Sequence, residues 1–221
     1  GGGVYARTLK EVPLSAEVKA LIGTAQDGMA PAELINALLK AQIDLLWFGG
    51  IGTYVKAASQ SNLEVGDRAN DALRVNGGEI RARVVGEGAN LGVTQPGRVE
   101  YARAGGHIDT DAVDNSAGVD TSDHEVNLKI LLSGPVRRGE LPEDARDTLL
   151  AAMTDDVAAL VLADNYDQTM ALSVAQSVAV RDLDAAARFM RDLESRARLD
   201  RTVEFLPGNA ALRALAQEKL G

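Results

Sequence analysis

Apolar residues in the first half of the chain fall into two kinds of pattern. In residues 31–41, four of them recur at helical spacing behind Pro31, which predicts a helix with proline in its first turn. Residues 43–48 form a compact apolar run that stops at two glycines, which predicts a buried strand. Trp47, the only tryptophan, is therefore expected in the core.

Four further segments before residue 133 carry weaker patterns. Residues 64–75 predict a second helix, and residues 80–85 predict a strand with alternate apolar residues on one face. Residues 107–119 predict one or two short strands. A helix is then expected to begin at Ser122, because Ser122 and Glu125 match the S-x-x-E pattern that caps helix N-termini.

The pattern changes at residues 133–144, where a Gly-Pro pair and a second proline interrupt the apolar spacing. Beyond that segment, apolar residues recur at helical spacing almost to the end of the chain. Strands that alternate with helices are typical of a parallel α/β sheet covered on both faces. We therefore expect an α/β domain in residues 1–135 and a C-terminal helical region in residues 136–221.

Charge and composition narrow the possible partners. The formal net charge of −9 and the scattered basic residues argue against binding to nucleic acid. No apolar run reaches the length of a membrane-spanning helix, so no membrane partner is expected. The absence of cysteine fits a cytoplasmic protein, and with only two histidines it argues against a structural zinc site, so no metal site is expected.

Polar or glycine-rich segments follow three of the predicted strands. These are residues 49–54, 86–92 and 114–125. Ligands of parallel α/β sheets bind beyond the carboxyl ends of the strands, so the three segments together suggest one crevice. Within the second segment, Glu87 and Asn90 stand among glycines, which suggests that something flat or bulky approaches the backbone there. Tight turns without any ligand are the alternative interpretation.

Two other motifs are weaker. Asp109, Asp111 and Asp114 are spaced like the ligands of a calcium loop, but the positions that an EF-hand reserves for glycine and glutamate hold Asp114 and Asp120. Calcium binding therefore stays a minor alternative. Ser122 and His124 are residue types of a catalytic triad, yet their closeness at one predicted helix start excludes the required geometry.

The segments GEGAN (residues 86–90) and DNSAGVDTSDHE (residues 114–125) resemble the coenzyme-domain signature of amino-acid dehydrogenases. Longer stretches of residues 1–175 resemble the large bacterial NAD-specific glutamate dehydrogenases. The resemblance implies the later half of a Rossmann-like coenzyme-binding domain, followed by the helical region. It also implies oxidative deamination of L-glutamate to 2-oxoglutarate and ammonia, with NAD as the hydride acceptor.

The resemblance further implies roles for individual residues. Asn90 would lie by the nicotinamide ribose, with Gly88 allowing the dinucleotide to approach, and Asn115 would approach the nicotinamide carboxamide. Thr53 is a weaker candidate for the ribose side of the cofactor. Ser122 would hydrogen-bond the side-chain carboxylate of glutamate, and Glu87 is expected to support its loop. The N-S-A-G-V sequence departs from the family's N-A-G-G-V, which affects the fit around Asn115.

The family's glycine-rich phosphate turn and its catalytic lysine and aspartate have no counterpart in this sequence, so no catalytic residue is assigned. We expect the chain to be an inactive segment of a longer polypeptide, whose other parts are its partners in a homo-oligomeric enzyme. The alternative function is a helical interaction or oligomerisation module without chemistry of its own, formed by the residues after Pro142.

Overall fold

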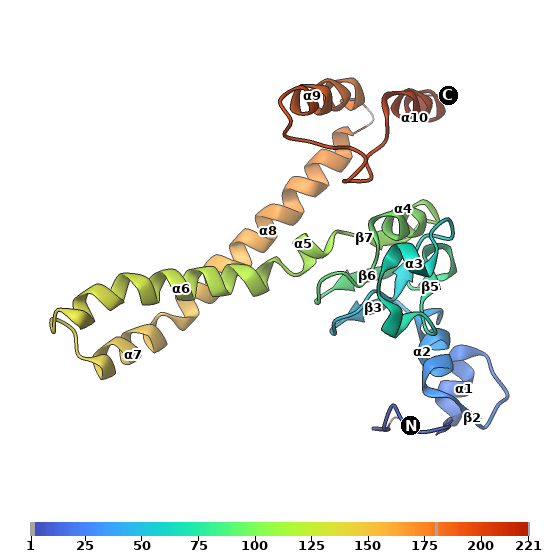
Figure 1. The fold of residues 1–221 in the computed structure, drawn as a ribbon, viewed down its shortest axis with the longest axis horizontal. Coiled ribbons are helices and arrows are strands. Elements are labelled where there is room, and N and C mark those ends of the chain that lie inside the picture. Colours follow the sequence, from blue (N-terminus) through green and yellow to red (C-terminus); the bar gives the residue numbers. More distant parts are fainter. Residues whose placement is uncertain (1–2, 180, 221) are drawn as a thin grey trace. The chain divides into compact units, whose positions relative to one another are not determined.

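The computed structural model describes residues 3–179 and 181–220, and the chain divides into two compact units, Gly1–Asn115 and Ser116–Gly221. Figure 1 shows the strands of the first unit and the helices of the second. The predicted α/β class is confirmed by a parallel sheet in the first unit and helices in the second. The boundary of the functional domains at residue 135 stays a prediction, while the compact units divide after residue 115.

The first unit contains short strands, short helices and two 3-10 turns. In chain order they are β1 (Val12–Pro13), α1 (Ala16–Ile22), β2 (Gly28–Met29), α2 (Pro31–Leu39), β3 (Leu45–Phe48), β4 (Val55–Lys56), α3 (Asn62–Val65), η1 (Arg68–Asn70), β5 (Val75–Asn76), η2 (Gly77–Glu79), β6 (Val84–Glu87), α4 (Gln95–Arg103), β7 (His107–Ile108) and α5 (Asp111–Asp114).

Three of these strands form the sheet that positions the candidate site. β3, β6 and β7 are adjacent in that order and all parallel, and Trp47 pairs with Gly86 across the first two. Smaller pairs flank this sheet: β4 is parallel to β5, and β1 is antiparallel to β2. The second edge of β3 pairs with no strand among the residues that the structure describes.

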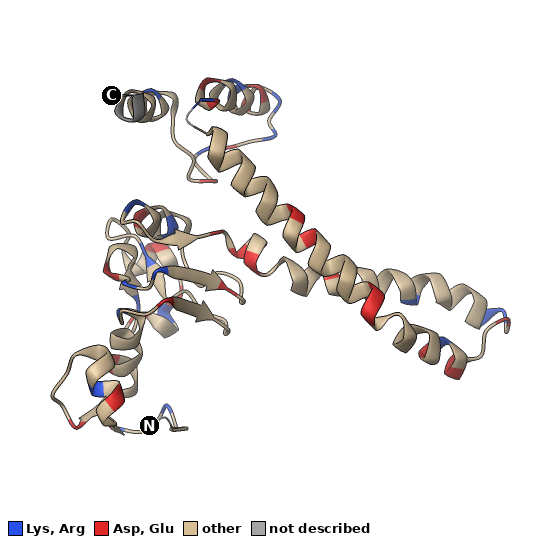
Figure 2. Cartoon of the chain, turned by 180° about the vertical axis from the view of Figure 1, so that it is seen from behind, with Lys and Arg blue, Asp and Glu red and all other residues tan. Residues whose placement is uncertain are grey.

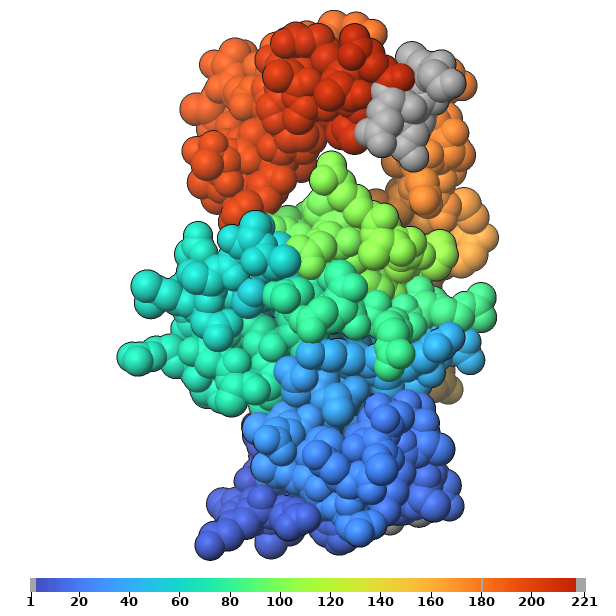
Figure 3. Space-filling model, turned by 90° about the vertical axis from the view of Figure 1, so that its right-hand side faces the viewer, coloured from blue at the N-terminus to red at the C-terminus, as the bar shows by residue number. Residues whose placement is uncertain are grey.

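The core of the first unit lies between the two parallel sheets and helix α4. Figure 3 shows the segments of this unit, coloured blue to green, as a continuous packed surface. The buried members of the core are Leu39, Phe48, Val55, Val75, Ile80, Ala82, Val85, Val93 and Tyr101. Tyr101 is 1% exposed, and its hydroxyl donates a 2.8 Å hydrogen bond to the Ala82 carbonyl, which satisfies the one polar atom of this large side chain.

Local chemistry explains where the helices of this unit begin. Thr94 caps α4 by accepting a 3.1 Å hydrogen bond from the Gly97 N–H, and prolines stand in the first turns of α2 and α4. The predicted helix over residues 31–41 is therefore confirmed as α2. The predicted helix over residues 64–75 is wrong, because Gly66 takes a left-handed φ of 79° and ends α3 at Val65.

The predicted strands are confirmed only in part. β3 and β6 form, but Ile80 and Ala82 precede β6, and Val84 is 41% exposed while Val85 is buried. Ile80, Ala82 and Val84 therefore do not share a buried strand face. In residues 107–119 only β7 is extended, and α5 follows it at Asp111.

The second unit is helical, as predicted for residues beyond 140. Its helices are α6 (Ser116–Arg137), α7 (Glu143–Ala152), α8 (Thr154–Val178), α9 (Leu183–Ser195) and α10 (Asn209–Leu220). α6 packs against α8, and α9 packs against α10. Among the described residues, no helix combines the length and the apolar character needed to cross a membrane.

Candidate functional site

The predicted site lies at the carboxyl ends of β3, β6 and β7, and a buried ion pair supports it. Glu87, the last residue of β6, is fully buried. Its Oε2 accepts a 2.8 Å hydrogen bond from Arg98 Nε and lies 2.7 Å from Arg98 Nη2, while its Oε1 accepts a 2.9 Å bond from the Val93 N–H. Glu87 thus fastens the two ends of the loop that follows β6, the supporting role expected from the sequence.

Burial dominates the electrostatics of this carboxylate. Removal from water raises the pKa of Glu87, while the guanidinium of Arg98 and the Val93 N–H oppose that rise. Arg98 Nη2 also lies 3.2 Å from Asp111 Oδ1, so one guanidinium joins the segment after β6 to the segment after β7.

Two aspartates of α5 complete the support through backbone N–H groups. Asp114 Oδ2 accepts a 2.8 Å hydrogen bond from the Glu87 N–H, and Asp111 Oδ2 accepts a 2.8 Å bond from the Leu91 N–H. The latter bond restrains Leu91, which has a left-handed φ of 63°. Burial raises the pKa of Asp114, and its bond to the Glu87 N–H opposes the rise. These carboxylates, considered for calcium from the sequence, bind backbone groups in the structure.

Asn115 and Gly88 are brought into direct contact. Asn115 Nδ2 donates a 2.9 Å hydrogen bond to the Gly88 carbonyl. The loop after β6 is also bonded to the segment after β3, because the Ala89 N–H donates to the Phe48 carbonyl at 2.9 Å. The ends of the three strands therefore form one connected region within the first unit.

Thr53 is held at the margin of this region by its backbone. Its N–H donates a 2.8 Å hydrogen bond to Asp67 Oδ2, and its carbonyl accepts a 2.8 Å bond from Arg74 Nε. Hydrogen bonds from Asn70 and Thr53 lower the pKa of Asp67. The next residue, Tyr54, donates its N–H to the Gly92 carbonyl at 2.8 Å, which places this segment beside the loop after β6.

The sequence suggested that a flat or bulky group approaches the glycines at the end of β6. In the structure that group is the Trp47 side chain of the same unit. An added Cβ at Gly86 or Gly88 would lie 2.5 Å from atoms of the Trp47 indole. Trp47 is 56% exposed, so the prediction that it is a core residue is wrong: the indole covers glycine backbone on one side and meets solvent on the other. The role of Gly88 toward a cofactor stays a prediction.

Asn90 is exposed at the tip of the loop after β6, and its side chain makes no hydrogen bond with the described residues. A hollow of about 350 Å³ lies at the carboxyl end of β3, lined in part by Trp47, Gly49 and Gly50. A larger hollow, of about 790 Å³, includes Asp44 and Arg83, which precede β3 and β6. Ligands of parallel sheets bind at the carboxyl ends, where the smaller hollow lies, but Thr53, Gly88, Asn90 and Asn115 are not among the residues that line it.

Ser122 belongs to the second unit, where it is an exposed residue inside α6. Helix α6 begins at Ser116, so the prediction that Ser122 caps a helix is wrong. The residues before Ser122 are mostly small or polar and show no apolar helical spacing, so the sequence pattern does not predict this earlier start. The role of Ser122 toward a substrate carboxylate stays a prediction.

Sequence reasoning missed Arg98 as part of the site. Arg98 follows Pro96 by two residues in the first half of α4. Neither its residue type nor its spacing in the sequence indicates that it is buried against Glu87. A single arginine on a helix is normally a surface residue. Only the fold shows that it is 9% exposed and faces Glu87.

Comparisons with known proteins agree with the resemblance. Residues 1–175 match the family model described as "Bacterial NAD-glutamate dehydrogenase, catalytic domain". Three similar proteins are called NAD-specific glutamate dehydrogenase: one from Pseudomonas aeruginosa (54% identical over 96% of this chain), one from Halomonas elongata (48% over 100%) and one from Mycobacterium tuberculosis (49% over 100%). This chain spans only 13–14% of the length of these relatives. The chain therefore belongs to the bacterial NAD-glutamate dehydrogenase family.

Proposed function

We propose that this chain is the later half of the coenzyme-binding domain of an NAD-dependent glutamate dehydrogenase, together with part of the helical region that follows. The whole enzyme would convert L-glutamate to 2-oxoglutarate and ammonia, and the segment alone would be inactive. The observation that carries the proposal is the sheet β3-β6-β7. Parallel strands whose order in the sheet follows their order in the chain are what one half of a doubly wound dinucleotide-binding sheet contains.

The residues at the strand ends suit a nicotinamide dinucleotide. The side-chain amide of Asn115 donates a hydrogen bond to the Gly88 carbonyl, while its side-chain oxygen accepts no hydrogen bond from the described residues. That oxygen can accept from a carboxamide such as that of nicotinamide. Asn90, exposed and without a side-chain hydrogen bond to the described residues, is proposed for the ribose, with Gly88 in the same loop and Thr53 at the margin of the region. When bound, NAD supplies the hydride acceptor.

The substrate side of the proposal depends on Ser122. An exposed hydroxyl can donate a hydrogen bond to the side-chain carboxylate of glutamate. In the complete polypeptide, Ser122→Ala is expected to raise KM for glutamate about 10- to 100-fold, because hydrogen bonds to charged groups contribute about 1.5–3 kcal/mol. Steady-state kinetics with glutamate as the varied substrate measure this. The matched control is Ser133→Ala on the same helix, whose hydroxyl bonds to its own helix at the Ile130 carbonyl.

The cofactor side is tested in the same assay with Asn90→Ala. Here KM for NAD should rise about fivefold while KM for glutamate stays unchanged, because a neutral hydrogen bond contributes about 1 kcal/mol. Unchanged kinetics in Ser122→Ala would remove Ser122 from the site, and unchanged kinetics in Asn90→Ala would remove Asn90. Each result leaves the other assignment standing.

A second function, contact between subunits or domains, is favoured by helix α8. Leu160, Leu162, Tyr166 and Val174 are all more than half exposed. Figure 2 shows this helix as mostly uncharged along its length. A helix that is apolar on several sides is normally buried, so homo-oligomerisation through this region is proposed for the parent enzyme.

Analytical ultracentrifugation of the full chain tests this surface. The sedimentation coefficient is expected to rise with concentration, and Leu162→Glu should reduce that rise because it introduces a charge into an apolar contact. The exposed substitution Asp167→Glu, on the same helix, is the control. A chain that stays monomeric at all concentrations would count against self-association.

A further inference from the structure

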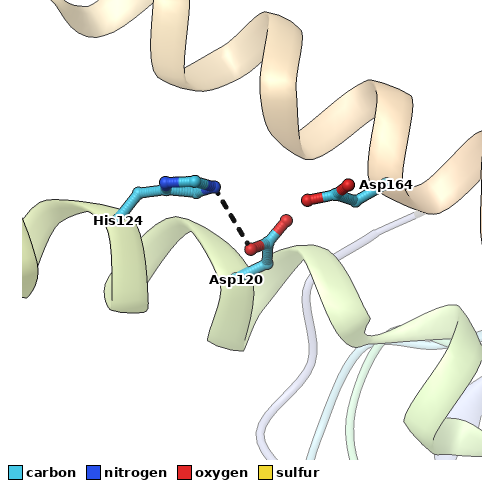
Figure 4. A group of neighbouring side chains, drawn as sticks. All are labelled: Asp120, His124 and Asp164. Atoms are coloured by element: carbon cyan, nitrogen blue, oxygen red, sulfur yellow. Dashed lines mark ion pairs between the residues drawn. The ribbon is translucent and has the colours of Figure 1, made fainter.

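Three potential metal ligands meet between helices α6 and α8 of the second unit. Asp120 and His124 are four residues apart on α6 and so share one face, and Asp164 approaches from α8 (Figure 4). One ligand atom from each side chain lies within 4.8 Å of the other two. The lack of cysteine argues against a site of the zinc-finger kind, but it does not bear on a site with one imidazole and two carboxylates.

The separation between Asp120 and His124 suits a shared ion. His124 Nε2 lies 3.4 Å from Asp120 Oδ1, which is long for a direct hydrogen bond. Two ligands bound tetrahedrally at about 2.0–2.1 Å from one zinc ion stand about 3.3–3.4 Å apart. Asp164 is exposed and makes no hydrogen bond or ion pair with the described residues, so its carboxylate can rotate inward.

Apart from His124, which is charged only when protonated, no cationic side chain of the described residues pairs with the two carboxylates. Asp120 Oδ2 is buried and has no hydrogen-bond partner among the described residues, and Figure 4 shows it on the side of Asp120 toward Asp164. Within the described part of the chain, no lysine or arginine forms an ion pair with either aspartate, and Lys129, the lysine of α6, pairs with Glu125. A buried carboxylate oxygen without a partner is costly, and a bound cation would satisfy it.

The two helices are already held together beside this group. Ser116 Oγ donates a 2.8 Å hydrogen bond to the side-chain oxygen of Asn165, the neighbour of Asp164. Val161, one turn before Asp164, is only 5% exposed. The ligands therefore come from a preformed helix pair, as in metal sites built between the facing helices of bundles.

We propose that Asp120, His124 and Asp164 bind one divalent transition-metal ion of the Zn²⁺ class, with water completing its coordination. The ion ties α6 to α8. It has a structural role, separate from the coenzyme and substrate residues proposed above, and the inference stands whether or not those assignments hold.

The test is calorimetric titration of the full chain, freed of metal by a chelator, with zinc chloride alone. One ion per chain is expected to bind, and His124→Gln and Asp164→Asn should each weaken binding by more than about tenfold. The matched controls are His107→Gln, which changes the other histidine of the chain, and Asp167→Asn on α8, and both should bind as the unchanged chain does.

A second measurement does not depend on how the His124 and Asp164 variants fold. Long-range ¹H–¹⁵N spectra of the histidine rings, recorded on the unchanged chain, should show zinc shifting one imidazole, and the His107→Gln spectrum should assign that shift to His124. Absence of saturable binding, equal binding by all four variants, or a shift of His107 alone would overturn the proposal. In that case Asp120 and His124 form an ion pair without metal.

Discussion

Replacing Arg98 with methionine is expected to lower the free energy of unfolding of the first unit by about 3–5 kcal/mol. The reason is that Glu87 is fully buried and would lose the guanidinium that compensates its carboxylate. Denaturant unfolding measures this effect through the fluorescence of Trp47, which is the only tryptophan and lies in the first unit. Arg103→Met, at an exposed position of the same helix, should change stability by less than about 0.5 kcal/mol.

The double substitution Glu87→Gln with Arg98→Met separates charge from packing. Glutamine keeps an oxygen that can accept from the Val93 N–H but carries no charge, so the double variant should recover more than half of the lost stability. If the double variant were as unstable as Arg98→Met alone, the loss would come from packing, and the electrostatic explanation would be wrong.

The effect of Arg98→Met should also depend on pH. Burial already raises the pKa of Glu87, and loss of the guanidinium raises it further. A carboxyl group with a raised pKa in the folded state stabilises the fold fully below its unfolded pKa, about 4.3 for glutamate. That contribution is lost as the pH rises through the folded pKa. The deficit of the variant should therefore shrink in acid and grow toward neutral pH.

Gly77→Ala is expected to destabilise the first unit by about 3 kcal/mol, the upper part of the range for overpacking. An added Cβ would lie 2.4 Å from the Gly97 carbonyl oxygen and 3.1 Å from the Tyr101 backbone nitrogen. Both atoms belong to the backbone of α4, so relief requires the helix to move away from the core. The same fluorescence-detected unfolding measures the loss.

The neighbouring glycine provides a matched control. In Gly78→Ala the nearest atom to the added Cβ is Glu100 Oε1, at 3.2 Å, which is the far end of a flexible side chain. The change in stability should stay below about 0.5 kcal/mol. Equal losses at both glycines would show that alanine acts through the backbone conformation of the turn and not through contact with α4.

Local sequence patterns identified the elements whose signals lie close together in the chain. The proline and the apolar spacing of residues 31–41 are sufficient for α2, and the apolar run before Gly49 is sufficient for β3. The prediction that Asn115 approaches the nicotinamide carboxamide came from resemblance, and the hydrogen bond from Asn115 to the Gly88 carbonyl is a contact that the sequence did not predict. Their roles toward a coenzyme stay predictions.

Features that depend on distant partners could not be predicted. The exposure of Trp47 depends on which elements pack against the sheet near it. Its contact with Gly86 depends on the register between β3 and β6. Burial of Arg98 depends on the packing of α4 against the end of β6. The start of α6 was misplaced because Ser122 and Glu125 match a capping pattern that the continuing helix overrides.

In the folded unit, one edge of β3 pairs with β6 and the other edge pairs with no described strand. During biosynthesis both edges of β3 are unpaired. β3 leaves the ribosome before its parallel partner β6, which follows only after β4 and β5 have been made. Until then the backbone N–H and C=O groups of β3 are unpaired and can bind another exposed strand. Leu45 and Trp47, each more than half exposed even in the folded unit, add apolar surface to that contact. Dilute refolding, or a chaperone that shields this segment, should therefore raise the yield of native chain by limiting aggregation.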